Sequence, residues 1–376
     1  MLFRTQRFLS SPFLAAFFKP PFCFFSRQTR LQFIQRLSTS CQNFCINLAP
    51  PGKPLELRPG KSPIMSTQEI VTEELLKIFI LDKEDDNTYV ANHLGDGTWL
   101  TKNVYGGALF AQSLVAAQKT VGSEFLPHSI HSLFILNVSP LKPVIYKTQR
   151  IRDGRSFCTR FITAHQNDKI VYSTQISFHV KEEGAITHQT EMPKVIEPEK
   201  CKASWDLARE FLEKAESGHL KVSPHVALAM QATIDDQKNA LVEFRPIDPE
   251  HQFALIPHKP KTYYYWTKVR TKLSDDREQH RALAAYITDA TLASTANRPH
   301  VSHGYTPSML VSLDNNTWFH TDDYRADEWM LYENESPIAQ NGRAFSLGKL
   351  WTRDGRLILS SAQESLSRTK VAKSSL

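Results

Sequence analysis

The sequence predicts an α+β protein built from two copies of one unit, each a buried helix followed by antiparallel strands. Residues 106–121, GGALFAQSLVAAQKTV, are apolar on nearly every side, which is typical of a helix buried all round. Residues 153–180 also align without a gap to residues 341–368, and each segment is predicted to form strand, turn and strand. A helix followed by a run of strands, occurring twice, defines the α+β class.

Composition indicates a globular chain. It has 376 residues, 41% of them hydrophobic, which is enough for two ordinary domains with apolar cores. Much of the net charge of +6 comes from residues 1–55, which contain Lys and Arg but no Asp or Glu. The remainder is close to neutral, so we expect no nucleic-acid partner. The apolar runs of the N-terminal segment are too short to span a bilayer, so we expect no stable membrane insertion.

Residues 1–64 are predicted to be a targeting leader or a disordered extension. The start of the chain combines Phe, Leu, Arg and Ser without acids, as a mitochondrial presequence does. Met65 is an alternative start for a shorter protein. The chain ends in SSL, which keeps the small first residue and the final Leu of a peroxisomal tripeptide but lacks its central base. We therefore expect the peroxisomal matrix or the mitochondrion, reached through organelle import receptors.

The rest of the chain divides into two units and a connection. We expect the N-terminal unit at residues 65–189, the C-terminal unit at residues 225–370, and a short tail at residues 371–376. Residues 190–224 alternate in charge, with two prolines near their start. This pattern predicts a linker with one exposed helix.

The helix of the second unit is predicted within LAAYITDATLASTANRP, ending at Asn297 and Pro299. It carries an acid, Asp289, whereas the first helix begins with Gly106 and Gly107, which would let a ligand approach closely. For an isolated Asp before ATLAS, a helix cap is the plainer explanation.

The strand predicted at residues 357–368, LILSSAQESLSR, carries a glutamine in an apolar context. Because strand side chains alternate, Gln363 shares a face with Leu359 and Ser361. A buried amide must find hydrogen-bond partners or cost about 1–3 kcal/mol, so Gln363 either fastens the core or binds a ligand. The gap-free repeat places Gln175 at the same position of the first unit.

Five motifs occur in order: VYGGALFAQSLVAAQKTV and PHSIHSLFIL in the first unit, and YITDATLAS, LVSLDNNTWFH and SSAQES in the second. This ordered set resembles the TesB-type (type II) acyl-CoA thioesterases, a double hotdog family in which each unit is a helix wrapped by a curved antiparallel sheet. In that family an Asp, a Thr or Ser, and a Gln orient a water. By motif position the resemblance assigns these roles to Asp289, Ser312 and Gln363. It implies acyl-CoA as substrate and no cofactor.

The same residues suit thioester hydrolysis on chemical grounds. A carboxylate can accept a water proton while an amide and a hydroxyl hold the water, without a covalent intermediate. Each member of the trio also has a plainer explanation: Ser312 and Gln363 as satisfied polar groups in a core, and Asp289 as a helix cap. Three arginines could meet the phosphates of coenzyme A, with a solvated strand face as the equal alternative: Arg150, Arg152 and Arg155.

Other motifs are weaker. The histidine pairs of PHSIHS and PHVSHG lack an HExxH pattern or a matching carboxylate, so we expect no metal site. No GxSxG occurs, which argues against an α/β-hydrolase serine nucleophile.

Two other functions stay open from the sequence. An enoyl-CoA hydratase of the hotdog fold would pair an Asp with a His near the helix start, but no His follows Asp289 until His300. A non-catalytic acyl-CoA-binding protein would be expected to have lost one of the trio. Two units in one chain already make a pseudo-dimer, which could pair again into a homo-oligomer.

Overall fold

The structure of the protein is a computed structural model that describes residues 73–95 and 103–369, all within one compact unit. The leader expected at residues 1–64 and the tail at 371–376 lie outside the described residues.

The N-terminal half contains one long helix and a run of antiparallel strands. Its elements are η1 (Lys77–Phe79), β1 (Asp82–Lys83), β2 (Thr88–Ala91), α3 (Gly106–Gln118), β3 (Phe125–Phe134), β4 (Val144–Asp153), β5 (Phe157–Gln166) and β6 (Lys169–Val180). Every residue of α3 except Gly106 and Val115 is buried, as the apolar sequence predicts. Small side chains such as Ala108 and Ala111 let the sheet and the neighbouring helix approach it.

The C-terminal half follows the same plan after a connection with its own helices. The connection carries η2 (Pro198–Lys200) and α4 (Ser204–Glu216). The half itself comprises α5 (Pro224–Asp235), η3 (Asp236–Lys238), β7 (Val242–Pro246), α6 (Pro249–Gln252), β8 (Tyr263–Val269), α7 (Arg277–Thr288), α8 (Leu292–Thr295), α9 (Asn297–Ser302), β9 (Met309–Ser312), β10 (Asp314–Phe319), β11 (Met330–Gln340), β12 (Arg343–Thr352) and β13 (Leu357–Arg368).

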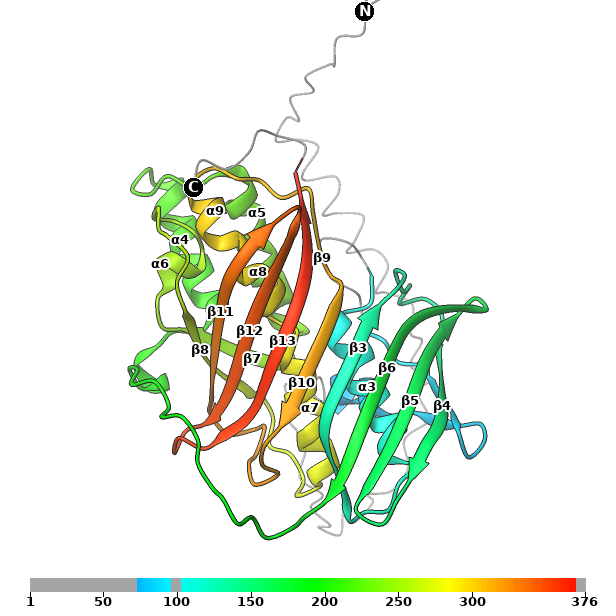
Figure 1. Cartoon of the computed structure of the whole chain (residues 1–376). Helices are drawn as coiled ribbons and strands as arrows, with labels where there is room; N and C mark the ends of the chain where they lie inside the picture. Colours follow the sequence, from blue (N-terminus) through cyan, green and yellow to red (C-terminus); the bar gives the residue numbers. More distant parts are fainter. Residues whose placement is uncertain (1–72, 96–102, 370–376) are drawn as a thin grey trace, which may run out of the picture. The chain divides into compact units, whose positions relative to one another are not determined.

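The described strands form one antiparallel sheet that runs through both halves. Its order is β1-β2-β4-β5-β6-β3-β10-β13-β12-β11-β8-β7, and β9 pairs with β13. The halves join where β3 pairs with β10, for example Ser132 with Asn315. Helices α3 and α7 pack against each other behind this sheet (Figure 1). The predicted double hotdog is confirmed.

The helix of the second half differs from the sequence prediction. Instead of running on to Asn297, it stops at Thr288 and resumes as the short helices α8 and α9. Asn297 is the first residue of α9, and Pro299 lies in the first turn of that helix, where a missing N–H is tolerated. Asp289 is the C-cap of α7 rather than the N-cap of a following helix. The break lies at the candidate site.

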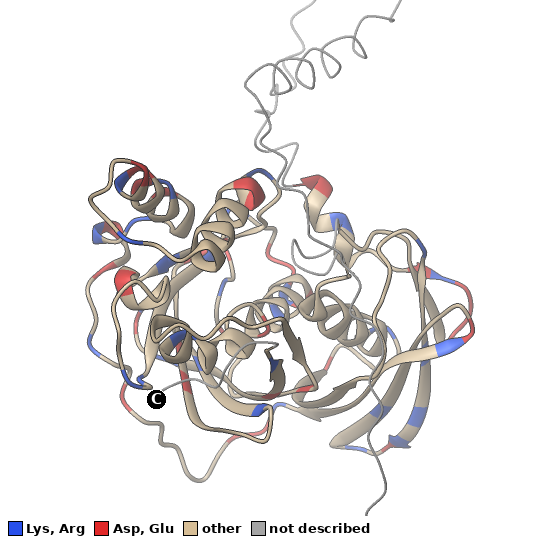
Figure 2. Ribbon diagram, turned by 90° about the horizontal axis from the view of Figure 1, so that it is seen from above, with Lys and Arg blue, Asp and Glu red and all other residues tan. Residues whose placement is uncertain are grey.

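The connection between the halves also corrects an expectation. Its helix α4 is exposed on one side only, because Trp205, Leu207, Ala208 and Phe211 are buried. Leu207, Ala208 and Phe211 of this stripe pack on α5, where Met230 is fully buried. Charged residues of both signs are interspersed over the described elements rather than gathered on one of them (Figure 2).

The gap-free repeat is wrong for the second strand of each hairpin. Gln166 pairs with Lys169 across a two-residue turn, whereas Trp351 pairs with Leu357 across a five-residue turn. An odd difference in turn length reverses which side chains face inward. Gln363 is therefore 1% exposed, as its strand pattern predicts, while Gln175 lies on the exposed face of β6.

We therefore expect Gln175→Ala to change the free energy of unfolding by less than about 0.5 kcal/mol, because an exposed amide leaves no buried partner unsatisfied. Urea denaturation measures this value. Gln363→Ala is the matched comparison and should cost about 1–3 kcal/mol, since it leaves buried groups without a partner. A loss at Gln175 as large as that at Gln363 would show that the two glutamines are equivalent after all.

Candidate active site

The structure brings the three candidate catalytic residues together. Gln363 extends inward from β13, Ser312 ends β9, and Asp289 stands at the break between α7 and α8. The Gln363 amide Nε2 donates to Asp289 Oδ1 at 2.5 Å and to Ser312 Oγ at 3.0 Å. Ser312 Oγ in turn donates to Asp289 Oδ1 at 3.2 Å. Gln363 Oε1 is buried and has no hydrogen-bond partner among the described residues, so it is free to accept a further hydrogen bond.

Two tyrosines stabilise the end of α7, where the helix breaks and the Asp289 carboxylate can reach Gln363 and Ser312. A helix end leaves its last carbonyls without intrahelical donors. Tyr105, just before α3 in the other half, donates from its hydroxyl to Tyr286 O at 2.9 Å. Tyr332 on β11 donates to Thr288 O at 2.7 Å. These bonds allow α7 to end inside the protein at the residue that the site needs.

Two glycines at the start of α3 make room for this helix end. A Cβ on Gly106 would lie 2.7 Å from Asp289 Oδ2, and one on Gly107 would lie 2.5 Å from Tyr286 O. The backbone N–H of Gly107 also donates to the Asp289 carboxylate. The sequence suggested that a ligand could approach these glycines closely. In the structure the Asp289 carboxylate lies against them, beside the positive end of the α3 helix dipole.

Burial dominates the protonation of this carboxylate. Asp289 is 8% exposed, and its burial raises its pKa to about 6. Hydrogen bonds from Gln363, Ser312 and Gly107 lower the pKa but do not cancel the effect of burial. The group is therefore ionised at neutral pH, yet basic enough to accept a proton from a reacting water.

The three candidate arginines do not reach this site. Arg150 and Arg152 lie on β4 and Arg155 in the following turn, all exposed. Four strands lie between β4 and β13, so the two are five strand steps apart, roughly 24 Å along the sheet at about 4.8 Å per step. Arg150 Nε instead donates to Asn87 Oδ1 at 3.0 Å. Their position agrees with the solvated strand face that the sequence left as the alternative.

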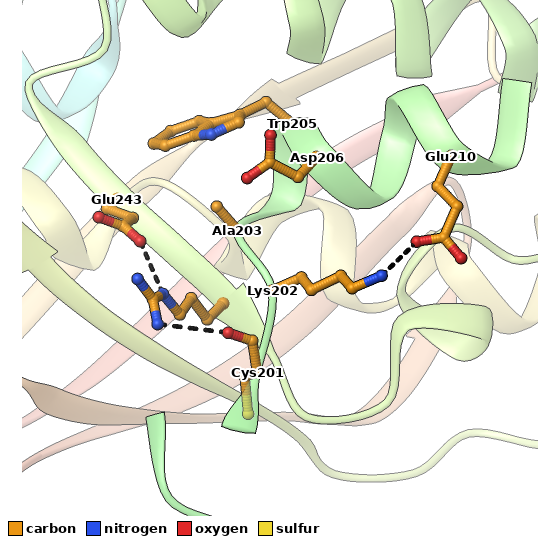
Figure 3. A pocket seen from close by; sticks show the side chains of 8 residues that line it. Cys201, Lys202, Ala203, Trp205, Asp206, Glu210 and Glu243 are labelled. Atoms are coloured by element: carbon orange, nitrogen blue, oxygen red, sulfur yellow. Dashed lines mark hydrogen bonds and ion pairs between the residues drawn. The ribbon is translucent and has the colours of Figure 1, made fainter. Parts of the chain in front are cut away.

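A surface pocket of about 440 Å³ lies away from the trio, at the connection between the halves (Figure 3). Its charged side chains are all paired. Lys202 Nζ lies 2.6 Å from Glu210 and Arg245 Nε lies 2.6 Å from Glu243, while Asp206 pairs with Arg209 outside the pocket lining at 2.9 Å. Because these charges are matched locally, the pocket shows no group set aside for a ligand.

Two absences apply only to residues 73–95 and 103–369, the described part of the chain. No group of three or more His, Cys, Asp or Glu side chains is placed to hold a metal ion there. No described helix is long and apolar enough to cross a membrane.

Sequence reasoning missed Tyr105 and Tyr332, which set the position of Asp289. Tyr105 directly precedes the two glycines, so its place in VYGG was a usable signal. Tyr332 lies in WMLYENES, where nothing distinguishes it from an ordinary core aromatic. Its role depends on the pairing of β11 with β12, which brings its hydroxyl to the helix end and to Ser361 Oγ at 3.3 Å.

A double hotdog that brings an Asp, a Ser and a Gln together at the inner end of α7, with the Asp and the Gln buried, defines a hotdog-fold hydrolase. Residues 96–179 match the family described as "Acyl-CoA thioesterase N-terminal domain", and residues 226–367 match "Acyl-CoA thioesterase C-terminal domain". The mouse (Mus musculus) protein "Acyl-coenzyme A thioesterase 8" is 34% identical over 77% of this chain and 87% of its own length. The chain belongs to the acyl-CoA thioesterase family.

Two other relatives extend the comparison. "Peroxisomal acyl-coenzyme A thioester hydrolase 1" of Saccharomyces cerevisiae is 26% identical over 80% of this chain and 96% of its own. Among solved structures, the acyl-CoA thioesterase II TesB2 from Mycobacterium marinum superposes with a TM-score of 0.61 at 28% identity, covering 78% of this chain and 98% of its own.

We expect Gly106→Ala to lower kcat by at least about tenfold, because its Cβ would displace the Asp289 carboxylate and small misplacements of a reacting group are costly. Ala is no worse a helix former than Gly, so helix propensity should not reduce stability. Steady-state hydrolysis and thermal unfolding of the same variant separate the two effects. Wild-type kcat in a folded Gly106→Ala protein would contradict the tight contact.

The raised pKa of Asp289 predicts a pH-dependent stability. Since the folded pKa of about 6 exceeds the ordinary value of 3.8, the stabilisation is complete below pH 4 and is lost as pH rises through 6. The loss amounts to roughly 3 kcal/mol at about 1.4 kcal/mol per pKa unit. Urea unfolding of wild type and Asp289→Asn from pH 4 to 7 isolates it, because Asn does not titrate. A pH-independent difference between the two proteins would mean that Asp289 has an ordinary pKa.

Proposed function

We propose that this protein hydrolyses fatty acyl-CoA to free fatty acid and coenzyme A by direct attack of water, with Asp289 as general base. The observation that carries the proposal is the buried Asp289 carboxylate, with a pKa of about 6, held by Gln363 and Ser312 in a member of the acyl-CoA thioesterase family.

Each group has a separate task in this mechanism. Oδ1 of Asp289 is occupied by the hydrogen bonds from Gln363 and Ser312, while Oδ2 lies beside Gly106. We assign the acceptance of the water proton to Oδ2. Gln363 Oε1, buried without a described partner, accepts the second hydrogen of the water and fixes its direction of attack. Ser312 hydrogen-bonds both groups and so holds the Asp289 carboxylate and the Gln363 amide in position.

The bond changes balance without a covalent enzyme intermediate. Water oxygen bonds to the thioester carbon as its proton passes to Asp289, and the carbonyl oxygen becomes an oxyanion. The positive end of the α3 dipole at Gly106 and Gly107 favours this negative charge. The C–S bond then breaks, and Asp289 returns its proton to the departing thiolate of coenzyme A.

The geometry favours hydrolysis over the two alternatives. Among the described residues, none of the hydrogen bonds to Asp289 comes from a histidine, which a hydratase of this fold would need. A binding module would not need a carboxylate kept basic by burial. Because Gln175 faces outward and the first helix offers no acid, we assign one active site to each chain.

We also propose the peroxisomal matrix as the location, with import through recognition of the SSL terminus. One relative is named peroxisomal in yeast, which supports this choice over mitochondrial import through the basic leader. Fluorescent tagging with and without SSL tests it, and a mitochondrial signal would favour the leader.

We also propose that two chains, each a pseudo-dimer of hotdog units, associate into a homo-oligomer. Light scattering of the purified protein measures its mass in solution.

We expect Asp289→Asn to lower kcat by at least about 10²-fold, the usual scale for loss of a positioned general base. Release of free thiol from acyl-CoA measures the rate. Wild-type kcat/KM should rise with pH through about 6 and then level off, since the ionised carboxylate is the active form.

The matched control for this substitution is Asp276→Asn, at the N-cap of the same helix α7. An Asn oxygen can still accept the hydrogen bond from Glu278 N, so the cap and the activity should persist. Equal rates for wild type and folded Asp289→Asn would reject the proposed role of Asp289.

A further inference from the structure

The Ser312 hydroxyl faces the site only because the strand that carries it is irregular. β9 pairs with β13 in the register Ser312 to Ser365, whereas β10 pairs in the register Asn316 to Ala362. Residues 313–315 thus stand opposite residues 363–364, three against two. Such an extra residue is a β-bulge, which re-aims the side chains around it.

The bulge changes the alternation of inward side chains. Ser312 faces inward to Asp289, and Asn315 also faces inward, fully buried, with its Nδ2 donating to Thr288 Oγ1 at 3.2 Å. In a regular strand two residues three apart would face opposite sides of the sheet. Without the bulge, a strand with Asn315 inward would turn Ser312 away from the site.

A carboxylate on the outer side closes this bulge. The bulged backbone keeps one bond to β13, from Leu313 N to Glu364 O at 2.8 Å. The Leu313 carbonyl accepts a hydrogen bond from Phe134 N of the N-terminal half at 2.9 Å. The Glu364 N–H is satisfied instead by the side chain of Asp314, whose Oδ1 accepts it at 2.7 Å.

Asp314 holds this place under unfavourable electrostatics. It is half-buried, it makes no ion pair with any described residue, and Glu364 carries a like charge beside it. Burial, and then the neighbouring Glu364 carboxylate, raise the pKa of Asp314. A half-buried acid without a cation is costly, so its hydrogen bond to the backbone is its evident contribution.

We propose that Asp314 is a positioning residue of the active site: by accepting the Glu364 N–H it maintains the bulge that directs Ser312 toward Asp289. Asp314 touches neither substrate nor reacting atoms and acts through Ser312. This inference rests on the proposed function, in which Ser312 orders the catalytic carboxylate.

The test compares five variants by thiol release and by amide hydrogen exchange at Glu364. Asp314→Ala should lower kcat about tenfold and leave KM nearly unchanged, because a misplaced catalytic group mainly costs turnover. Asp314→Asn should restore the rate, since its Oδ1 can still accept the N–H. The Glu364 amide should exchange rapidly in the Ala variant and slowly in the Asn variant.

A double substitution separates positioning from a general loss of stability. If Asp314 acts through Ser312, the Ser312→Ala/Asp314→Ala protein should have the kcat of Ser312→Ala alone, within about twofold. Glu364→Gln is the matched control on the same outer face, because it removes a neighbouring charge and keeps the backbone N–H. It should have wild-type kcat.

Several results would overturn the proposal. These are a wild-type kcat in folded Asp314→Ala, an Asp314→Asn protein whose kcat stays as low as that of Asp314→Ala, or a double variant whose loss of kcat is the product of the two single losses. If Asp314→Ala does not fold, Asp314→Ser replaces it, with the same loss expected because its hydroxyl is too short to reach the N–H. If wild-type protein releases no thiol, the proposed function fails, and the Glu364 exchange rates then decide separately whether Asp314 holds the bulge.

Discussion

The carboxylate of Asp289, buried between the two central helices, is the group around which the rest of the site is arranged. No Lys or Arg among the described residues forms an ion pair with it, so neutral donors alone offset the cost of its burial. A cation would stabilise the ionised form and depress its pKa, which would make it a poor base. Amide, hydroxyl and backbone donors keep it in place while leaving it basic.

This requirement accounts for several otherwise unrelated features. α7 must end at Thr288 so that Asp289 is released from the helix, and two tyrosine hydroxyls satisfy the carbonyls that the break leaves open. α3 must begin with glycines because the carboxylate and the α7 backbone occupy the space of their side chains. A substitution at any of these positions therefore acts on the same carboxylate, although the residues are far apart in the sequence.

The two halves share one architecture but contribute differently to the site. The N-terminal half supplies backbone, through the start of α3, and the hydroxyl of Tyr105. The C-terminal half supplies the three candidate catalytic side chains. The halves also differ in one hairpin turn, which has two residues between β5 and β6 and five between β12 and β13. This difference of three residues reverses the face that turns inward in β13 relative to β6, so Gln363 is buried and Gln175 is not. One chain with two hotdog units thus holds one proposed catalytic trio.

The sequence by itself determined the fold class, the all-round burial of α3 and the inward face of Gln363, because helix and strand periodicity are local properties of the chain. Its ordered motifs also indicated the family and the three candidate residues. Only the tertiary structure decided that α7 breaks at Asp289, that a bulge turns Ser312 inward, and that Gln175 is not the structural equivalent of Gln363 in the other half. These features depend on strand register and on contacts between segments distant in sequence, such as Tyr105 with Tyr286, which no local pattern encodes.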